Sequence, residues 1–263
     1  MPAGRMTLFP SWVRSLAPLV GADLRRRYAG SLLGGAWAVL APVLEAATYG
    51  VVFGWVLGAS ASRGLPYAVL IASGLFPWIA FREAVEGCAT LLPDNRWIRR
   101  SRVPLDLLVA KLVVTASVRA AIGLLVVLGF ALATGRRPGA AGWLLPPVAF
   151  VLQAIGTFGV GRLVAPVAAL APDLRPTLVS ALTLLTFASP ILYPESAARG
   201  WLRTVLLCNP FTYLLRLYRT PAEPLAGAGL LGSLAVATSA ALAMAALGGW
   251  VRERAWWRAR DLL

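Results

Sequence analysis

The residues that most clearly suggest contact with another molecule form a short arginine-rich segment between Pro93 and Pro104. Its positive charges surround an apolar pair, Trp97 and Ile98, and they are Arg96, Arg99, Arg100 and Arg102. An apolar pair inside a charged segment is stabilised only when it packs against another apolar surface. The pattern therefore predicts a short helix that lies on or just below a membrane.

Residue types that carry out catalysis are scarce. The chain has no histidine, which removes the commonest general base and metal ligand. Cys88 and Cys208 lack metal-ligand spacing, and we expect two buried thiols that form no disulfide with each other. The only lysine, Lys111, stands in Ala-Lys-Leu, so no Gly-x-x-x-x-Gly-Lys-Ser/Thr loop is present to hold ATP phosphates. We therefore expect no catalytic residue, no metal and no cofactor bound by this chain.

The elements that position these residues are membrane helices. Of 263 residues, 59% are hydrophobic and 14% charged, whereas soluble domains average roughly 45–50% and 25%. The net charge of +14 could suggest nucleic acid, but the arginines flank apolar runs and do not gather on one polar domain. The composition predicts an all-α integral membrane protein that does not bind nucleic acid.

Six apolar segments can cross a bilayer, which takes roughly 20 residues. The predicted spans are 32–58, 65–90, 105–134, 143–171, 177–193 and 227–250. Residues 11–28 are predicted to form an amphipathic helix in the interface. Residues 194–226 are predicted to form an external re-entrant helical hairpin, hinged at Asn209-Pro210. The whole chain, 1–263, is then one transmembrane domain, with a cytoplasmic loop at 91–104.

Arginine beside a span stays on the cytoplasmic side of the membrane. With both termini, the 91–104 loop and Arg175 inside, 14 Lys and Arg residues are cytoplasmic and 7 are external. Four of the external ones lie in the 194–226 hairpin. We therefore expect this hairpin to pack its arginines within the protein.

Charges inside spans cost about 2.5–3.5 kcal/mol each on insertion scales and usually face the protein interior. Glu45 and Arg119 lie at a similar depth, about 20 Å into spans one and three at ~1.5 Å per residue. They are expected to pair, or else Arg119 faces a polar or anionic substrate. Two further contacts are expected, Arg82 with Glu86 and Arg162 with Glu83 or Glu86.

Five groups of motifs occur in order along nearly the whole chain. They are Arg27-Tyr28-x-x-Ser31-x-Leu33-Gly34-x-x-Trp37 with Pro42; Tyr49 to Phe53-Gly54; Gly74-Leu75-Phe76-Pro77-Trp78; Asn95-x-x-Ile98-x-x-x-x-Val103-Pro104; and Ser189-Pro190-Ile191-x-Tyr193-Pro194 with Asn209-Pro210-Phe211. Together they resemble the permease subunits of type 2 ABC transporters that export polysaccharides, such as O-antigen and teichoic acid exporters.

The resemblance implies a homodimeric permease in the bacterial inner membrane that exports a lipid-linked polysaccharide. A separate ATPase subunit, which holds ATP and magnesium, would power it. The ATPase-coupling residues would be Arg96, Trp97, Ile98, Arg99, Arg100, Arg25, Arg26 and Arg27. For the 91–104 loop the alternative is a solvated determinant of topology, and for the N-terminal arginines it is anchoring to anionic lipid.

Two further sets of residues are predicted to handle the substrate. Aromatic faces can pack on sugar rings, so the substrate path is predicted to include Tyr49 and Phe53 of the first span and Trp78 of the second. The charged residues Arg119 and Glu45 inside the spans are predicted to belong to it as well. The alternative for the aromatic residues is helix packing or contact with lipid. The gate is predicted at the proline-rich breaks of the hairpin, Pro190, Tyr193, Pro194, Asn209 and Pro210.

Other functions remain open from the sequence alone. A drug or lipid exporter would have the same fold. An intramembrane enzyme would need converging carboxylates or histidines, whereas this chain has no histidine and only a few scattered carboxylates inside its spans. A passive channel or scaffold would need no ATPase.

Overall fold

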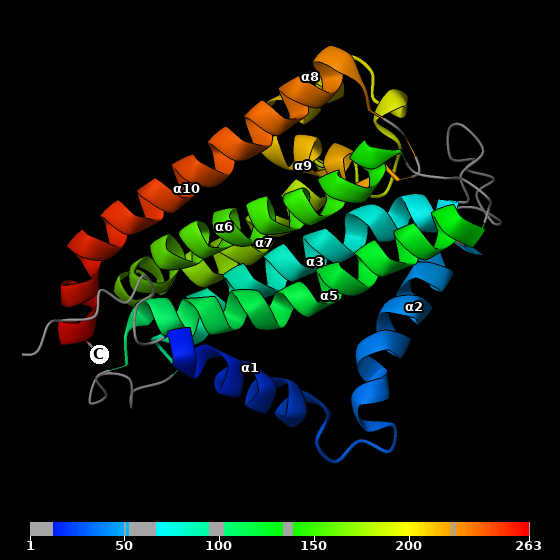
Figure 1. Ribbon diagram of the computed structural model, residues 1–263. Coiled ribbons are helices and arrows are strands. Elements are labelled where there is room, and N and C mark those ends of the chain that lie inside the picture. Colours follow the sequence, from blue (N-terminus) through cyan, green and yellow to red (C-terminus); the bar gives the residue numbers. More distant parts are fainter. Residues whose placement is uncertain are drawn as a thin grey trace, which may run out of the picture.

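The computed structural model describes residues 13–49, 51–52, 67–94, 103–133, 139–221, 223 and 225–262. All regular secondary structure in this part of the chain is helical, as predicted. The helices are α1 (Val13–Tyr28), α2 (Trp37–Tyr49), α3 (Tyr67–Leu91), α5 (Leu105–Ala133), α6 (Ala140–Leu170), α7 (Leu174–Phe187), α8 (Trp201–Cys208), α9 (Pro210–Tyr218) and α10 (Gly227–Leu262), with 3-10 turns η1 (Gly34–Ala36) and η4 (Glu195–Ala197) (Figure 1).

Helix α3 lies at the centre of the bundle. It packs most extensively on α5 and α6, and it also contacts α2, α7 and α9. Helix α10 runs along α6 and touches α9. Figure 1 shows the C-terminal ends of α3, α6 and α10 at one end of the bundle, while α8 and α9 lie at the other.

Among the described residues, three helices are long and apolar enough to span a membrane. These stretches are Leu105–Gly129, Ala140–Leu170 and Gly227–Trp256. Helix α3 has 25 residues but carries charged side chains in its C-terminal half. Helix α7 is apolar but has only 14 residues, because the chain turns at Ala188, just before Pro190.

The outer surface of the bundle is apolar. Leu125, Leu144, Leu184 and Leu231 are each at least 66% exposed, and they lie on four different helices. A protein surrounded by water rarely exposes so much large apolar surface. This surface therefore meets lipid or another apolar chain, as expected of an integral membrane protein.

Small residues allow α6 and α10 to touch backbone to backbone. A Cβ atom placed on Gly248 would lie 2.7 Å from the carbonyl carbon of Gly159, and one on Gly159 would lie 2.5 Å from the nitrogen of Ala245. The many Ala and Gly residues of α10 therefore allow it to pack closely on α6.

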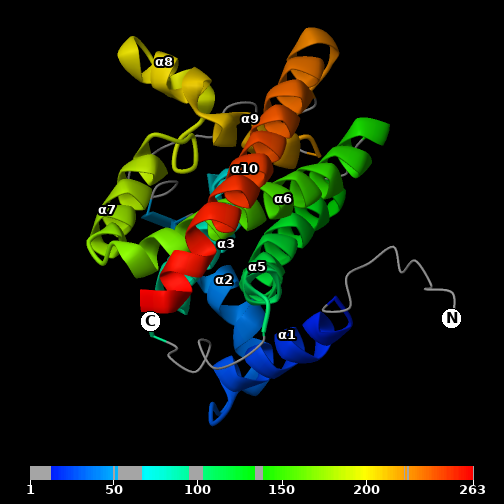
Figure 2. The same cartoon turned by 90° about the vertical axis from the view of Figure 1, so that its left-hand side faces the viewer.

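The two cysteines have different surroundings. Cys88 is buried in the core of α3, where its sulfur lies beside Gly161 of α6. Cys208 is exposed at the end of α8, a helix that projects from the bundle (Figure 2). The prediction of two buried thiols is therefore wrong for Cys208, because α8 leaves that position uncovered.

Candidate coupling and hairpin sites

Helix α1 is fixed to the bundle by a chain of charges. Asp23 forms an ion pair with Lys111 of α5, in which Nζ and Oδ1 are 2.6 Å apart. The other carboxylate oxygen of Asp23, Oδ2, lies 3.4 Å from Nε of Arg27. Arg27 also pairs with Glu83 of α3. Asp23 and Arg27 are four residues apart, so one face of α1 presents both charges to the bundle.

The electrostatics of this cluster favour the ionised forms. Burial acts to raise the pKa of Asp23, but Lys111 and Arg27 outweigh it and hold the pKa below its ordinary value. Of the three predicted coupling arginines of α1, Arg27 is thus engaged within the chain, while Arg25 and Arg26 are exposed. The latter two are available to lipid or to a partner.

A second ion cluster joins α5, α6 and α10. The carboxylate of Asp106, in the first turn of α5, lies 3.1 Å from Nε of Arg162 and 3.2 Å from Nε of Arg252. The atoms are at ion-pair distance, although their orientation is not that of hydrogen bonds. The expected contact of Arg162 with Glu83 or Glu86 is wrong, because the Arg162 side chain reaches toward the start of α5.

Two further pairs lie near the same end of the bundle. Arg82 pairs with Glu86 at 2.7 Å, as predicted from their spacing. Arg175, at the start of α7, pairs with Asp94 at 2.9 Å and donates to the carbonyl of Ala89. Through these contacts the start of α7 is held against the end of α3.

At the opposite end, the predicted hinge residue Asn209 ties the hairpin to the end of α7. Its Nδ2 donates to the carbonyl of Ala188 at 3.0 Å and to Oγ of Ser189 at 2.7 Å. Its Oδ1 accepts from the backbone N–H of Phe211 and so caps α9, where Pro210 takes the first helical position. This asparagine therefore fixes the angle at which α9 enters the bundle.

Arg219 continues this connection in the interior, and only 7% of it is exposed. Its guanidinium donates to the carbonyl of Pro190 at 2.7 Å and to Oγ of Ser73 at 3.1 Å. A Cβ on Gly74 would lie 3.2 Å from both the Arg219 guanidinium and the backbone of Ile191. The glycine thus leaves room for the arginine and the 190–191 turn to approach α3.

Arg216 is also packed inside the hairpin. It pairs with both carboxylate oxygens of Glu195, and its Nε lies 2.8 Å from Oε2. The hydrogen bond to Glu195 raises the pKa of Arg216 above its ordinary value, although burial opposes this. Arg216 and Arg219 are thus packed within the chain as expected. The expectation is wrong for Arg199 and Arg203, which are exposed because they lie before and on α8, the helix that projects from the bundle.

The other predicted gate residues lie in the turn between α7 and α8. Tyr193 donates its hydroxyl to the carbonyl of Phe187 at 2.6 Å, which closes the turn over the end of α7. Pro190 supplies the carbonyl that Arg219 binds, and Pro194 caps η4. The predicted gate residues are therefore gathered between α7, α8 and α9.

Trp78, predicted for the substrate path, is only 3% exposed. Its indole N–H donates to Oγ1 of Thr186 at 2.9 Å. Its ring packs edge-on against Phe211, with centroids 5.1 Å apart, and lies 5.6 Å from that of Phe81. Trp78 thus joins α3 to α7 and α9. This contact is the helix packing that the sequence analysis gave as the alternative to a place in the substrate path.

The remaining predicted site residues lie outside the described part of the structure. They include Arg96, Trp97, Ile98, Arg99 and Arg100 of the loop and Phe53, together with the side chains of Glu45, Tyr49 and Arg119. The helices that carry Glu45 and Arg119, α2 and α5, are in contact. The pairing of these two residues stays a prediction.

With this arrangement established, comparison with known proteins identifies the family. A family model described as ABC-2 type transporter matches residues 16–221. The chain belongs to the ABC-2 type transporter membrane family. Similar proteins include the O-antigen export system permease protein RfbA of Myxococcus xanthus, 31% identical over 209 residues. Two proteins of the same name from Klebsiella pneumoniae are 23% and 25% identical over 206 residues, and in all three cases 78% of each chain is covered.

As an ABC-2 family member, the chain is a transporter subunit and not itself an enzyme. The family match ends at residue 221 and so includes the hairpin. Sequence reasoning missed Asp106 and Arg219 as organising residues. The sequence pattern that could have indicated Arg219 is an arginine directly after the amphipathic helix 210–218. The pattern that could have indicated Asp106 is an acidic residue in the first turn of a span.

Proposed function

We propose that this chain is the channel-forming permease of an ABC transporter that exports a lipid-linked polysaccharide across the bacterial inner membrane. The observation that carries the proposal is the match with the O-antigen export permease of Myxococcus xanthus, at 31% identity over 78% of both chains. The ordered motifs of the sequence support the same substrate class over a drug or lipid.

The proposed topology has six spans with both termini in the cytoplasm. Three described helices have the length and hydropathy of spans, and α2, α3 and α7 would supply the others. The ion clusters around Asp106 and Arg175 would then lie near the cytoplasmic face, in agreement with the arginine distribution. Helix α1 would lie in the cytoplasmic interface, and α8 and α9 would form the external re-entrant hairpin.

Transport would require two further chains. A second copy would complete the channel, and the exposed apolar surface of the bundle is compatible with such a partner. A separate ATPase would hold ATP and magnesium, since this sequence has no phosphate-binding loop. The 91–104 loop and the exposed Arg25 and Arg26 would contact this ATPase.

Deletion of the gene tests the proposal. We expect the surface polysaccharide to disappear while the lipid-linked glycan accumulates on the cytoplasmic side, and we expect a plasmid copy to restore export. An unchanged amount of surface glycan in the deletion strain would contradict the proposed substrate.

A further inference from the structure

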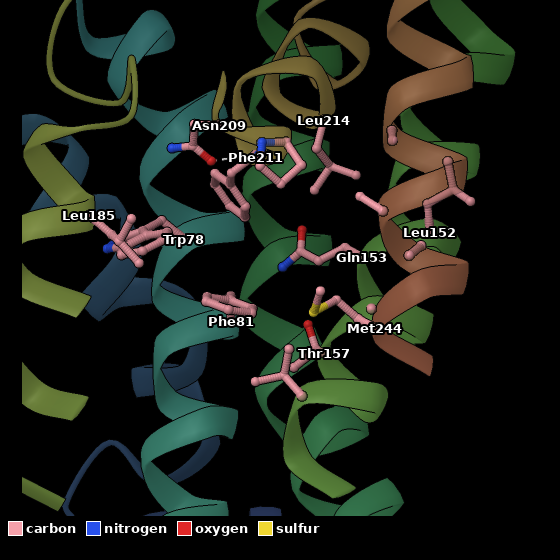
Figure 3. A pocket seen from close by; sticks show the side chains of 16 residues that line it. Trp78, Phe81, Leu152, Gln153, Thr157, Leu185, Asn209, Phe211, Leu214 and Met244 are labelled. Atoms are coloured by element: carbon pink, nitrogen blue, oxygen red, sulfur yellow. Dashed lines mark hydrogen bonds between the residues drawn. The ribbon is translucent and has the colours of Figure 1, made fainter. Parts of the chain in front are cut away.

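A cavity of about 270 Å³ lies between α3, α6, α7, α9 and α10. Figure 3 shows Trp78 and Phe81 on the left and Leu152 on the right, with Gln153 and Met244 between them; Ala240 of α10 also lines the cavity. The hinge residues Asn209 and Pro210 lie at one end. An apolar cavity of about 150 Å³ already holds benzene, so this one has room for a longer hydrocarbon.

The cavity offers a ligand almost no free polar group. Both polar atoms of the Gln153 amide are hydrogen-bonded within the chain, since Nε2 donates to the carbonyl of Pro77 at 2.7 Å and Oε1 accepts from Tyr218 at 2.9 Å. The amide of Asn209 is likewise bound to backbone and to Ser189. The other lining residues are apolar apart from Thr157 and the bonded Trp78. Such a lining favours hydrocarbon over a sugar or a phosphate.

The cavity lies at the depth of the hydrocarbon core. Trp78, Gln153 and Ala240 each stand 11 to 13 residues from the start of their helices. At ~1.5 Å per residue this places all three about 17–20 Å from those helix ends. The hydrocarbon core of a bilayer is about 30 Å thick, so the cavity is near its middle.

The mouth of the cavity lies between α7 and α10. Leu185 of α7 and Met244 of α10 both line the cavity, and they are 41% and 37% exposed on the outside of the bundle. Leu184 and Leu242, which neighbour them in sequence, are 72% and 59% exposed. The entrance is therefore framed by the apolar surface that faces the interior of the membrane.

We propose that this cavity binds a single hydrocarbon chain of a membrane lipid, which enters between α7 and α10. A bound chain restores the dispersion contacts that an empty apolar cavity loses. It also touches the Asn209-Pro210 hinge, so the hairpin and the bound lipid share a surface. The inference requires that the chain be embedded in a membrane and does not depend on its cargo.

Photolabelling of the full-length chain in nanodiscs tests this site. One probe is a phosphatidylethanolamine with a diazirine near the end of an acyl chain, and the other is a polyprenyl phosphate with a benzophenone at the end of its chain. We expect adducts at Leu185, Leu152 and Met244. Labelling by the first probe alone identifies a phospholipid chain as the source, and labelling by the second identifies an isoprenoid chain.

The matched variants are Ala240→Phe and Ala243→Phe on α10. Ala240 lines the cavity, whereas Ala243 is exposed and does not. Because a phenyl ring at position 240 fills the space, we expect adducts at Leu152 to fall about tenfold in that variant and to remain unchanged in the control. Ala240→Leu, a milder change, should give an intermediate loss if the larger variant does not fold.

Equal labelling of the two variants would overturn the proposal, as would adducts confined to the exposed residue Leu242. Because this readout does not depend on transport, loss of the proposed export function would leave the labelling result unaffected.

Discussion

The contact between α6 and α10 gives a quantitative test of the packing. In Gly248→Ala, the new methyl carbon would lie 2.7 Å from the carbonyl carbon of Gly159 and closer still to its oxygen. Ordinary contact begins near 3.4 Å, so α10 must move away from α6 by at least 0.7 Å. Overpacking of this kind typically costs about 1–3 kcal/mol, and because the obstacle is backbone we expect a value at the upper end.

The neighbouring glycine provides the control. A Cβ on Gly249 would meet the guanidinium of Arg162 at ordinary distances of 3.7 to 4.0 Å. Alanine is favoured over glycine inside a helix by about 0.5–1 kcal/mol, so Gly249→Ala should be neutral or slightly stabilising. The helix preference of alanine applies to both variants and cancels, so the two should differ by the overpacking cost alone, about 3 kcal/mol.

The assay is unfolding by SDS in mixed micelles, followed by circular dichroism. We expect the midpoint to move to lower SDS for Gly248→Ala and to remain unchanged or rise for Gly249→Ala. Equal midpoints for both variants would refute the close backbone contact between α6 and α10.

Three further predictions concern the charged sites and the loop. The pKa of Asp23 in the folded chain is below its ordinary value of 3.8. Its ion pair with Lys111 therefore stabilises the docking of α1 at any pH above 3.8, and this stabilisation is lost as the pH falls through the pKa of the folded state. Hydrogen exchange of α1 should therefore speed up in acid, and Asp23→Asn should remove this dependence; an identical pH profile in the variant would contradict the pairing. Trp97→Ala should abolish ATP hydrolysis coupled to transport without lowering the amount of folded permease, and retained transport would leave the loop as a topology determinant only. A double-mutant cycle of Arg216→Ala and Glu195→Ala should give a coupling energy of about 1 kcal/mol for this partly exposed pair, measured by unfolding, and zero coupling would contradict it.

The helical breaks of the hairpin could be predicted because proline acts locally. Pro210 cannot continue α8, and Asn209 before it supplies a cap, so both short helices follow from the sequence. The α6–α10 contact was also predictable in kind, since Gly and Ala lower the distance at which helices can pack. What could not be predicted was which glycine faces which, because this depends on the rotation of each helix.

Ion partners were harder to predict than helices. The sequence places Arg162 near the inner end of its span and predicts an ion pair with Glu83 or Glu86 of α3. In the structure its side chain instead reaches Asp106 at the start of α5, where Arg252 also arrives. The long arginine side chain can reach partners at several depths, so depth alone does not select one. The hydrogen bonds of Gln153 with Tyr218 and Pro77 likewise join residues 65 and 76 positions apart, which no local pattern indicates.

The most direct test of the proposed function is export by inverted membrane vesicles. Vesicles that contain this chain, its ATPase and the lipid-linked glycan are given ATP, and the glycan is then tested for protection from an added glycosidase. We predict that the glycan becomes protected inside the vesicles only when both ATP and this chain are present. Equal protection with and without this chain would contradict its role as the export permease.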